Sequence, residues 1–421
     1  MLDRMLTTTT SDRRRLPGSR PFHLILLALA TSALGDWLYN VALLALVFGR
    51  TGSATWVALT TAARVLPVVV LGPLGGVLAD RHDRRALMIG ADAARMVLMV
   101  GLAVVAAAGL PIVLAPLLAA LATSASTVTS PSVAASTARL VADNELQRAN
   151  ALRSAIGQAA IVTGPAVGAV LLAVSDPAVA ILVNGATFAV SAAAVLAIGR
   201  HEAFVPRSRG ERERESVLAE IAAGARALRG APTAVRLVAS DVLCSGVYGL
   251  LTVMLVLVSR QVGAGDGGYG ILLGGFGAGG LVGAALLSRI DTPATWRRTL
   301  TVALLLVAAS MAALGQSRTI AEALVLAVLG GGGMIVGEVL SETALPRMLD
   351  DEVLGRAYGL AIPVSLGGIV VGSLMAGPLV SLLGLEGAFA AAGAFVALTA
   401  AVVLRRPLMV SPAAAPVAPA H

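Results

Sequence analysis

Long apolar runs alternate with short polar turns along nearly the whole chain, and each run has about the 20 residues that a helix needs to cross a bilayer. In the first half these runs lie near residues 21–48, 54–79, 86–107, 111–138, 147–174 and 177–199. After a polar stretch they resume near residues 232–259, 267–289, 297–315, 319–345, 353–382 and 386–404. The pattern predicts an all-α membrane protein with twelve transmembrane helices.

The polar stretch in the middle divides the chain into two halves. We expect a tail at 1–20, a six-helix bundle at 21–199, a linker at 200–231, a second six-helix bundle at 232–405 and a tail at 406–421. Within the linker, the run that begins at Ser216 has the apolar spacing of an amphipathic helix. The first apolar run continues to about Phe48, which is too long for a signal peptide and favours a retained helix.

The two halves also resemble each other in sequence. The segment Leu146-Gln-Arg148-Ala149 aligns with Leu354-Gly-Arg356-Ala357 at an offset of 208 residues, and the same offset pairs Asp143 with Asp351. Repeats of this kind relate the halves of some transporters by an axis along the membrane normal. We therefore expect two pseudo-symmetric six-helix bundles.

Composition and charge placement agree with a membrane location. The chain is 57% hydrophobic and 13% charged, about half the charged fraction of soluble domains. All 31 basic residues are arginine and most lie in the turns, so the net charge of +7 indicates membrane orientation and not a nucleic-acid surface. When both termini are placed in the cytoplasm, only Arg50, Arg260 and Arg318 fall on the outer side of the membrane. The absence of lysine beside abundant Ala, Gly, Val and Arg suggests a bacterial protein, and the membrane is then expected to be the inner membrane.

The turn after the second apolar run carries the most specific motif. Its sequence, Gly76-Val-Leu-Ala-Asp80-Arg-His-Asp83-Arg84-Arg85, resembles the turn between helices 2 and 3 of the major facilitator superfamily of transporters, although Asp83 stands where that family most often has glycine. The resemblance implies two bundles that open a central cavity alternately to each side. We expect charge pairs at this turn to form a conformational latch that breaks as the bundles rock; its residues are Gly76, Asp80, Arg81, Arg84, Arg85, Asp92 and Arg95.

Ionisable residues inside the apolar runs indicate a functional site. At a rise of ~1.5 Å per residue, Asp36 and Arg64 both lie ~22 Å from the cytoplasmic surface. An unpaired charge at that depth costs at least ~2.5–3.5 kcal/mol. We therefore expect either that Asp36 and Arg64 pair or that a protonatable Asp36 faces a cavity. A static salt bridge is one interpretation, and a coupling site in which Asp36 takes up and releases a proton as Arg64 moves is the other. Trp37, Tyr39 and Asn40 are expected to line the cavity, and Glu338 is a second candidate for proton or cation binding.

A glycine–proline pair in the fifth helix suggests a bend. The segment Gly164-Pro165-Ala-Val-Gly168 resembles a signature of antiporters in the same superfamily, although Ala169 and Ala160 replace two of its glycines. Glycine–proline pairs bend or loosen a membrane helix, so Gly164, Pro165 and Gly168 are expected to assist rocking.

No pattern typical of an enzyme or a cofactor site is present in the sequence. Gly275-Phe-Gly277-Ala-Gly-Gly280 matches a dinucleotide motif, but it lies inside an apolar run without a preceding strand and predicts close helix packing. The four histidines are too scattered for a metal centre, and a chain without lysine has no nucleotide-binding P-loop. We expect no cofactor, no metal, no nucleic-acid partner and a monomer.

The segments Leu34–Trp37, Arg64–Pro67 and Asp80–Arg85 resemble the drug, macrolide and siderophore exporters of the superfamily, including enterobactin exporters. The resemblance implies proton-coupled antiport that exports lipophilic or amphipathic small molecules. Facilitated or proton-driven uptake, lysophospholipid translocation and a non-transporting receptor on the same scaffold remain open alternatives.

Overall fold

The computed structural model describes residues 19–206, 232–287, 295–344 and 351–403, and the predicted tails and most of the predicted linker, including its helix, lie outside these ranges. All regular structure in the described residues is helical. The helices are α1 (Arg20–Thr51), α2 (Ala54–Arg81), α3 (Arg84–Ala107), α4 (Leu114–Ser126), α5 (Thr129–Leu140), α6 (Leu146–Val174), α7 (Pro177–Ile198), α9 (Pro232–Gln261), α10 (Gly265–Leu287), α11 (Trp296–Leu314), α12 (Ile320–Ala344) and α13 (Asp351–Val403), with the 3-10 turns η2 (Asp143–Glu145) and η3 (Glu202–Phe204).

Within the described residues, eleven helical segments are long and apolar enough to cross a membrane. Two of them differ from a single straight helix. The predicted run 111–138 is formed by α4 followed directly by α5, which together make one candidate span, Leu114–Leu140. The 53 residues of α13 would extend for about 80 Å as one helix. Gly384, with φ of 70° and ψ of 173°, interrupts α13 between the two runs predicted there.

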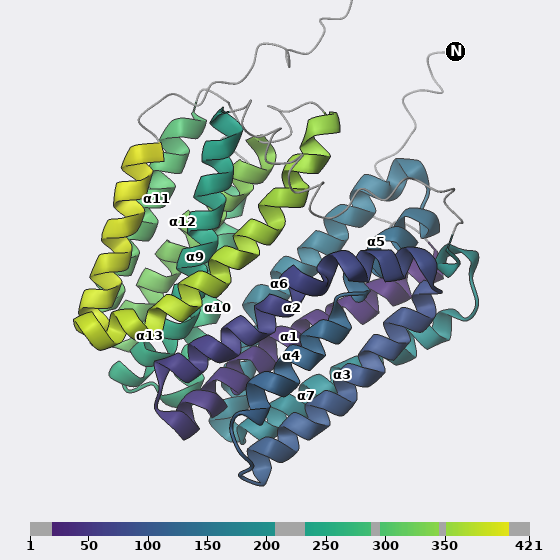
Figure 1. The fold of residues 1–421 in the computed structure, drawn as a ribbon, viewed down its shortest axis with the longest axis horizontal. Helices are drawn as coiled ribbons and strands as arrows, with labels where there is room; N and C mark the ends of the chain where they lie inside the picture. The colour runs from purple at the N-terminus through teal and green to yellow at the C-terminus, as the bar shows by residue number, and fades with distance from the viewer. Residues whose placement is uncertain (1–18, 207–231, 288–294, 345–350, 404–421) are drawn as a thin grey trace, which may run out of the picture.

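The helices gather in two groups, with α1–α7 in one and α9–α13 in the other (Figure 1). Helix α1 of the first group begins, and helix α13 of the second group ends, at the same end of the molecule, which we call the terminal end. We call the opposite end the far end. The groups lean together toward the far end and diverge toward the terminal end in Figure 1. Small residues permit the close approach. A Cβ on Gly270 of α10 would lie 2.7 Å from the Pro165 carbonyl oxygen of α6, and one on Gly377 of α13 would lie 2.7 Å from the Thr55 hydroxyl of α2.

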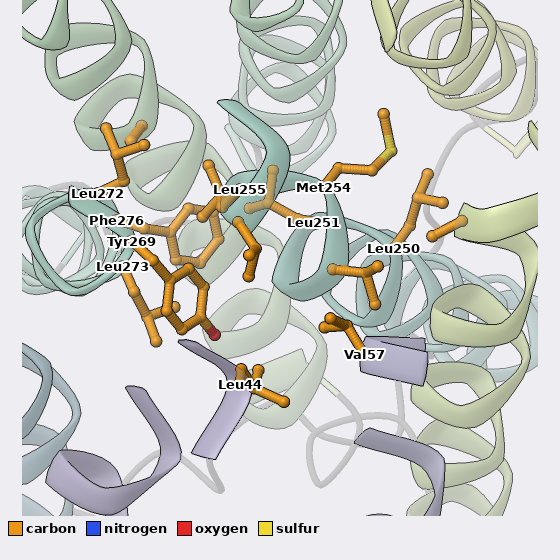
Figure 2. Packing of buried hydrophobic residues seen from close by; sticks show 14 of the residues in the cluster. Leu44, Val57, Leu250, Leu251, Met254, Leu255, Tyr269, Leu272, Leu273 and Phe276 are labelled. Atoms are coloured by element: carbon orange, nitrogen blue, oxygen red, sulfur yellow. The ribbon is translucent and has the colours of Figure 1, made fainter. Parts of the chain in front are cut away.

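Apolar side chains from both groups form one buried cluster, and the part of it shared by the two groups lies near the far end. Figure 2 shows Leu44 of α1 and Val57 of α2 beside Leu250 and Leu251 of α9 and Tyr269 of α10. These side chains are almost fully removed from the surface. Because the cluster is continuous across the two groups, it closes the far end of the space between them.

The glycine-rich run of α10 packs against α12. A Cβ on Gly279 would meet the backbone of Val328, and one on Gly331 would meet the backbone of Phe276. The run lies inside a helix and is used for close contact between helices. This confirms the packing role predicted from the sequence and excludes the dinucleotide interpretation.

The crossing of α9 and α13 provides a test of this packing. A Cβ on Gly372 would collide with the backbone of Gly246, so Gly372→Ala should push the helices apart and destabilise the protein by about 1–3 kcal/mol. Gly367→Ala is the matched control on the same helix, because no heavy atom lies within 4 Å of its added Cβ. We expect a lower thermal unfolding temperature in detergent for Gly372→Ala only; equal temperatures would contradict the close crossing.

Candidate functional site

A cavity of about 330 Å³ lies among α1, α2, α3, α4 and α7 and reaches α9 and α13 of the second group. Three charged side chains line it, namely Asp36, Arg64 and Arg95. Much of the remaining wall is aromatic or apolar, and it includes Trp37, Tyr39, Met99, Phe188, Tyr248 and Ile369. The cavity therefore combines a few charges with an apolar lining, which is the usual composition of a small-molecule site.

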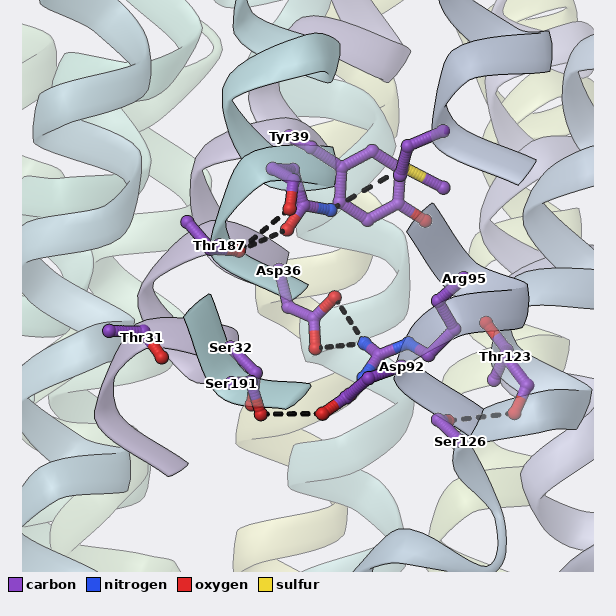
Figure 3. Close-up of polar contacts among 12 residues, drawn as sticks. Thr31, Ser32, Asp36, Tyr39, Asp92, Arg95, Thr123, Ser126, Thr187 and Ser191 are labelled. Carbon is purple, nitrogen blue, oxygen red and sulfur yellow. Dashed lines mark hydrogen bonds and ion pairs between the residues drawn. The ribbon is translucent and has the colours of Figure 1, made fainter. Parts of the chain in front are cut away.

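Asp36 of α1 and Arg95 of α3, which both line the cavity, form an ion pair (Figure 3). The Nη2 atom of Arg95 lies 2.6 Å from Oδ1 and 2.5 Å from Oδ2 of Asp36. The Arg95 side chain is only 6% exposed, whereas that of Asp36 is 36% exposed. The arginine is thus fixed within the helices, while the carboxylate faces the cavity.

Arg95 also contacts a second carboxylate and an aromatic ring. Its Nη1 atom lies 3.8 Å from Asp92 Oδ1, and its guanidinium carbon lies 3.8 Å from the centre of the Phe188 ring. Ser191 of α7 donates a hydrogen bond of 2.6 Å to Asp92 (Figure 3). One guanidinium therefore serves two carboxylates, and the stacked ring excludes water from one of its faces.

Arg64 of α2 has neutral partners among the described residues. Its Nε atom donates to the Tyr39 hydroxyl at 3.0 Å, and its Nη1 atom donates to the Asn40 side-chain oxygen. The Tyr39 ring lies 4.9 Å from the guanidinium carbon. The charge of Arg64 is held in place by hydrogen bonds and by a cation–π contact.

The predicted ion pair between Asp36 and Arg64 is wrong. Helices α1 and α2 are antiparallel and joined by the short turn at Gly52, so Arg64 lies level with Asn40, and Asp36 lies one helical turn nearer the terminal end. The partner of Asp36 is Arg95, which we expected to belong to the latch. Asp92 and Arg95 contact each other, but they do not lie at the turn between α2 and α3, because Arg95 lines the cavity and Asp92 is buried beside it.

The turn between α2 and α3 is held by arginines that bind carbonyl groups of the same half. Asp83 caps α3 by accepting a hydrogen bond from Ala86 N at 2.8 Å, while Arg84 lies 3.7 Å from Asp80. Arg85 donates to the Val195 and Leu196 carbonyls at the end of α7 at 3.3 and 3.0 Å.

The other predicted latch residues contribute less to this arrangement. Arg81 is exposed, and Gly76 has no neighbour that a Cβ would meet. Gly75, one residue earlier, is the glycine that lies against the backbone of Thr127.

Sequence reasoning missed the anchoring of the segment after α7. Arg84 and Arg139 both donate to the Ala203 carbonyl, and Arg139 donates to that of Val205 at 2.5 Å. Phe204 inserts into an apolar cluster with Phe22 and Val195 at the terminal end. The signal available in the sequence was a lone aromatic residue within a polar stretch. The beginning of the linker is therefore part of the first half.

The remaining predicted residues lie elsewhere in the fold. Gly164 packs against Trp37, and a Cβ on Gly168 would lie 2.8 Å from the Leu38 carbonyl oxygen, so both belong to a crossing between α6 and α1. Helix α6 is assigned as helix through Pro165. Glu338 of α12 is half-buried and is not among the residues that line the cavity.

The second half contains a polar contact that the sequence did not predict. Ser365 of α13 donates a short hydrogen bond to Asp241 of α9. This contact joins the two helices of the second half that pack closely through Gly372 and Gly246. Among the described residues, no group of three or more His, Cys, Asp or Glu side chains is arranged to hold a metal ion.

The chain is similar to known membrane transporters. Residues 18–421 match the family model described as transmembrane secretion effector. An uncharacterised MFS-type transporter of Bacillus subtilis, YfiS, is 27% identical, and the match covers 85% of this chain and 83% of the relative. The putative bacilysin exporter BacE of Bacillus subtilis is 27% identical, with 83% of this chain and 86% of the relative covered. The nucleoside transporter NupG (D323A mutant) has the same fold, with a TM-score of 0.71 at 12% identity over 92% of this chain and 98% of NupG.

The unequal partners of the two cavity arginines lead to a stability prediction. Arg95→Gln leaves Asp36 and Asp92 without their described cation, which should cost about 3 kcal/mol. Arg64→Gln removes hydrogen bonds to neutral groups and should cost about 1.5 kcal/mol. Thermal unfolding in the same detergent compares the two variants. Equal losses would contradict the central position of Arg95.

Proposed function

The chain belongs to the transmembrane secretion effector family of major facilitator transporters, and we propose that it exports small molecules in exchange for protons. Membership of this family makes it a multi-pass membrane transporter and not an enzyme. What we propose is the direction of transport, the ion that is coupled to it and the class of cargo. The outward direction is supported by the Bacillus subtilis relative described as a putative bacilysin exporter.

We propose twelve membrane helices in two six-helix bundles, with α13 counted as two spans on either side of Gly384. We place the terminal end in the cytoplasm and the protein in the inner membrane as a monomer. The arginines at the terminal end support this orientation, because Arg84, Arg85 and Arg139 lie there, whereas Arg50 and Arg260 lie at the far end. In this orientation the apolar cluster shared by the two groups lies toward the external side, and the two groups diverge toward the cytoplasm.

The observation that carries the proposal of proton coupling is the ion pair of Asp36 with Arg95 at the cavity. The carboxylate is 36% exposed toward a cavity that water can enter, so a proton can reach it. Protonation removes its charge and weakens the contact with Arg95, which frees the guanidinium toward Asp92. The alternative is a permanent salt bridge with a purely structural role, and the experiments below distinguish it from a coupling site.

In this proposal, alternating access is driven at a fixed site when Arg95 changes its carboxylate partner from Asp36 to Asp92. A proton that arrives from outside neutralises Asp36 and alters the charge facing the cargo, and its release to the cytoplasm restores the pair. The aromatic and aliphatic wall suits lipophilic or amphipathic molecules of the drug, macrolide or siderophore class. Facilitated or proton-driven uptake, lysophospholipid translocation and a receptor role are the other outcomes of a flux assay.

The test of coupling uses Asp36→Asn in proteoliposomes, with a cargo identified by growth protection against a panel of toxic compounds. An amide keeps the size of the side chain but takes up no proton. We therefore expect transport driven by a pH gradient to fall at least tenfold, while exchange of labelled for unlabelled cargo continues.

The matched control is Asp176→Asn, which makes the same chemical change at an exposed position outside the cavity, at the N-terminal cap of α7. It should leave both activities unchanged. Full proton-driven transport by Asp36→Asn would remove Asp36 as the coupling residue.

The latch is tested by separating rate from stability. The Asp80 side chain is 59% exposed and lies 3.7 Å from Arg84, so this pair contributes less than about 1 kcal/mol to the described state. If Asp80 stabilises the other conformation, Asp80→Asn should lower the transport rate about tenfold with an unfolding temperature close to that of the parent protein. An unchanged transport rate would show that the turn between α2 and α3 only stabilises the first half.

A further inference from the structure

The charges that line the cavity are not balanced. Asp36 is the only carboxylate among the lining residues, and it is engaged by Arg95. Arg64 also lines the cavity, but it contacts an amide oxygen, a phenol oxygen and an aromatic ring. With Asp36 ionised, the described lining therefore carries one cation that has no carboxylate in direct contact.

The geometry of Arg64 leaves its hydrogen-bonding edge available. A guanidinium has five N–H donors, and the two contacts described use Nε and one hydrogen of Nη1. No protein acceptor among the described residues is recorded for Nη2. One hydrogen on Nη1 and two on Nη2 remain as a fork of donors for a carboxylate.

The contacts that Arg64 does make hold this fork in place. The Tyr39 hydroxyl and the Asn40 oxygen fix two edges of the guanidinium, and the Tyr39 ring supports it at 4.9 Å. Preorganisation of this kind reduces the ordering cost when a ligand binds. Trp37, Met99 and Tyr248 add apolar surface to the wall for the body of a ligand.

We propose that Arg64 is the recognition residue for the cargo, and that the cargo carries an anionic group, a carboxylate or its equivalent, on an aromatic or apolar body. This rests on the proposed transport function and narrows its substrate class. A cationic cargo is disfavoured, because the one carboxylate that lines the cavity is already paired with Arg95.

Anionic cargo has a consequence for energetics. One monoanion moved outward in exchange for one proton moved inward transfers two elementary charges in the same electrical sense. A membrane potential that is negative inside therefore drives the exchange. A neutral cargo would transfer one charge per cycle and a singly charged cationic cargo none.

Binding to the full-length protein in lipid nanodiscs tests the proposal with three probes of one shape. The probes are 2-naphthoate, 2-naphthalenemethanol and 2-naphthylmethylammonium, measured by equilibrium dialysis. We expect naphthoate to bind at least tenfold more tightly than the other two. Arg64→Gln should remove this preference and leave the affinity for the neutral probe unchanged, and Arg64→Lys should retain part of it. Arg318→Gln, which removes an arginine whose side chain is 75% exposed outside the cavity, is the control and should bind as the parent protein does.

The preference is overturned if the ammonium probe binds most tightly, or if Arg64→Gln weakens all three probes equally. Flux assays in proteoliposomes separate this result from the proposed function. Naphthoate that binds through Arg64 but is not moved by a pH gradient would support the site and contradict its use in export. Proton-driven export of the neutral or cationic probe, without naphthoate binding, would support export and overturn the anion site.

Discussion

The structure depends on how charge is neutralised inside a membrane. An unpaired charge at the centre of a bilayer costs at least ~2.5–3.5 kcal/mol. This chain places one carboxylate, Asp36, and two guanidiniums on the lining of one cavity, with the carboxylate of Asp92 buried beside Arg95. Arg95 offsets the largest part of this free-energy cost, because it contacts Asp36, Asp92 and the Phe188 ring at once. A pair of this kind is stable only while both partners are charged. Its balance therefore changes when a proton binds to the exposed partner, Asp36.

The rest of the fold makes that change useful. An apolar cluster shared by the two groups of helices closes the far end, and small residues such as Gly270 bring the helices close enough to seal it. At the terminal end, Arg85 of the turn between α2 and α3 binds carbonyls of α7, which ties these helices of the first half together. The buried cluster shared by the two halves is apolar and without direction, whereas the first half also has hydrogen bonds between its own helices. That difference favours rocking of one half against the other over internal rearrangement.

The sequence predicted an all-helical membrane protein correctly and the site only in part. Apolar runs fixed the helix boundaries, because bilayer thickness requires them, and a charged turn located the motif around Asp80. The residues of the cavity on α1 and α2 were also found. Their pairing was not, since the depth of Asp36 and Arg64 says nothing about the angle at which a third helix presents Arg95. Hydrogen bonds to backbone carbonyls, such as those of Arg84 and Arg139 beside Phe204, do not depend on which residue carries the carbonyl, so the sequence does not reveal them.

The central claim is that Asp36 exchanges a proton at the cavity while Arg95 stays charged. Infrared difference spectroscopy of the reconstituted protein, recorded between alkaline and acidic pH, observes that exchange through the carbonyl stretch of a protonated carboxyl group. We predict a carboxyl band that appears on acidification in the parent protein, shifts when cargo is added and is absent in Asp36→Asn. A band that persists unchanged in Asp36→Asn would assign the proton to another group and contradict the account.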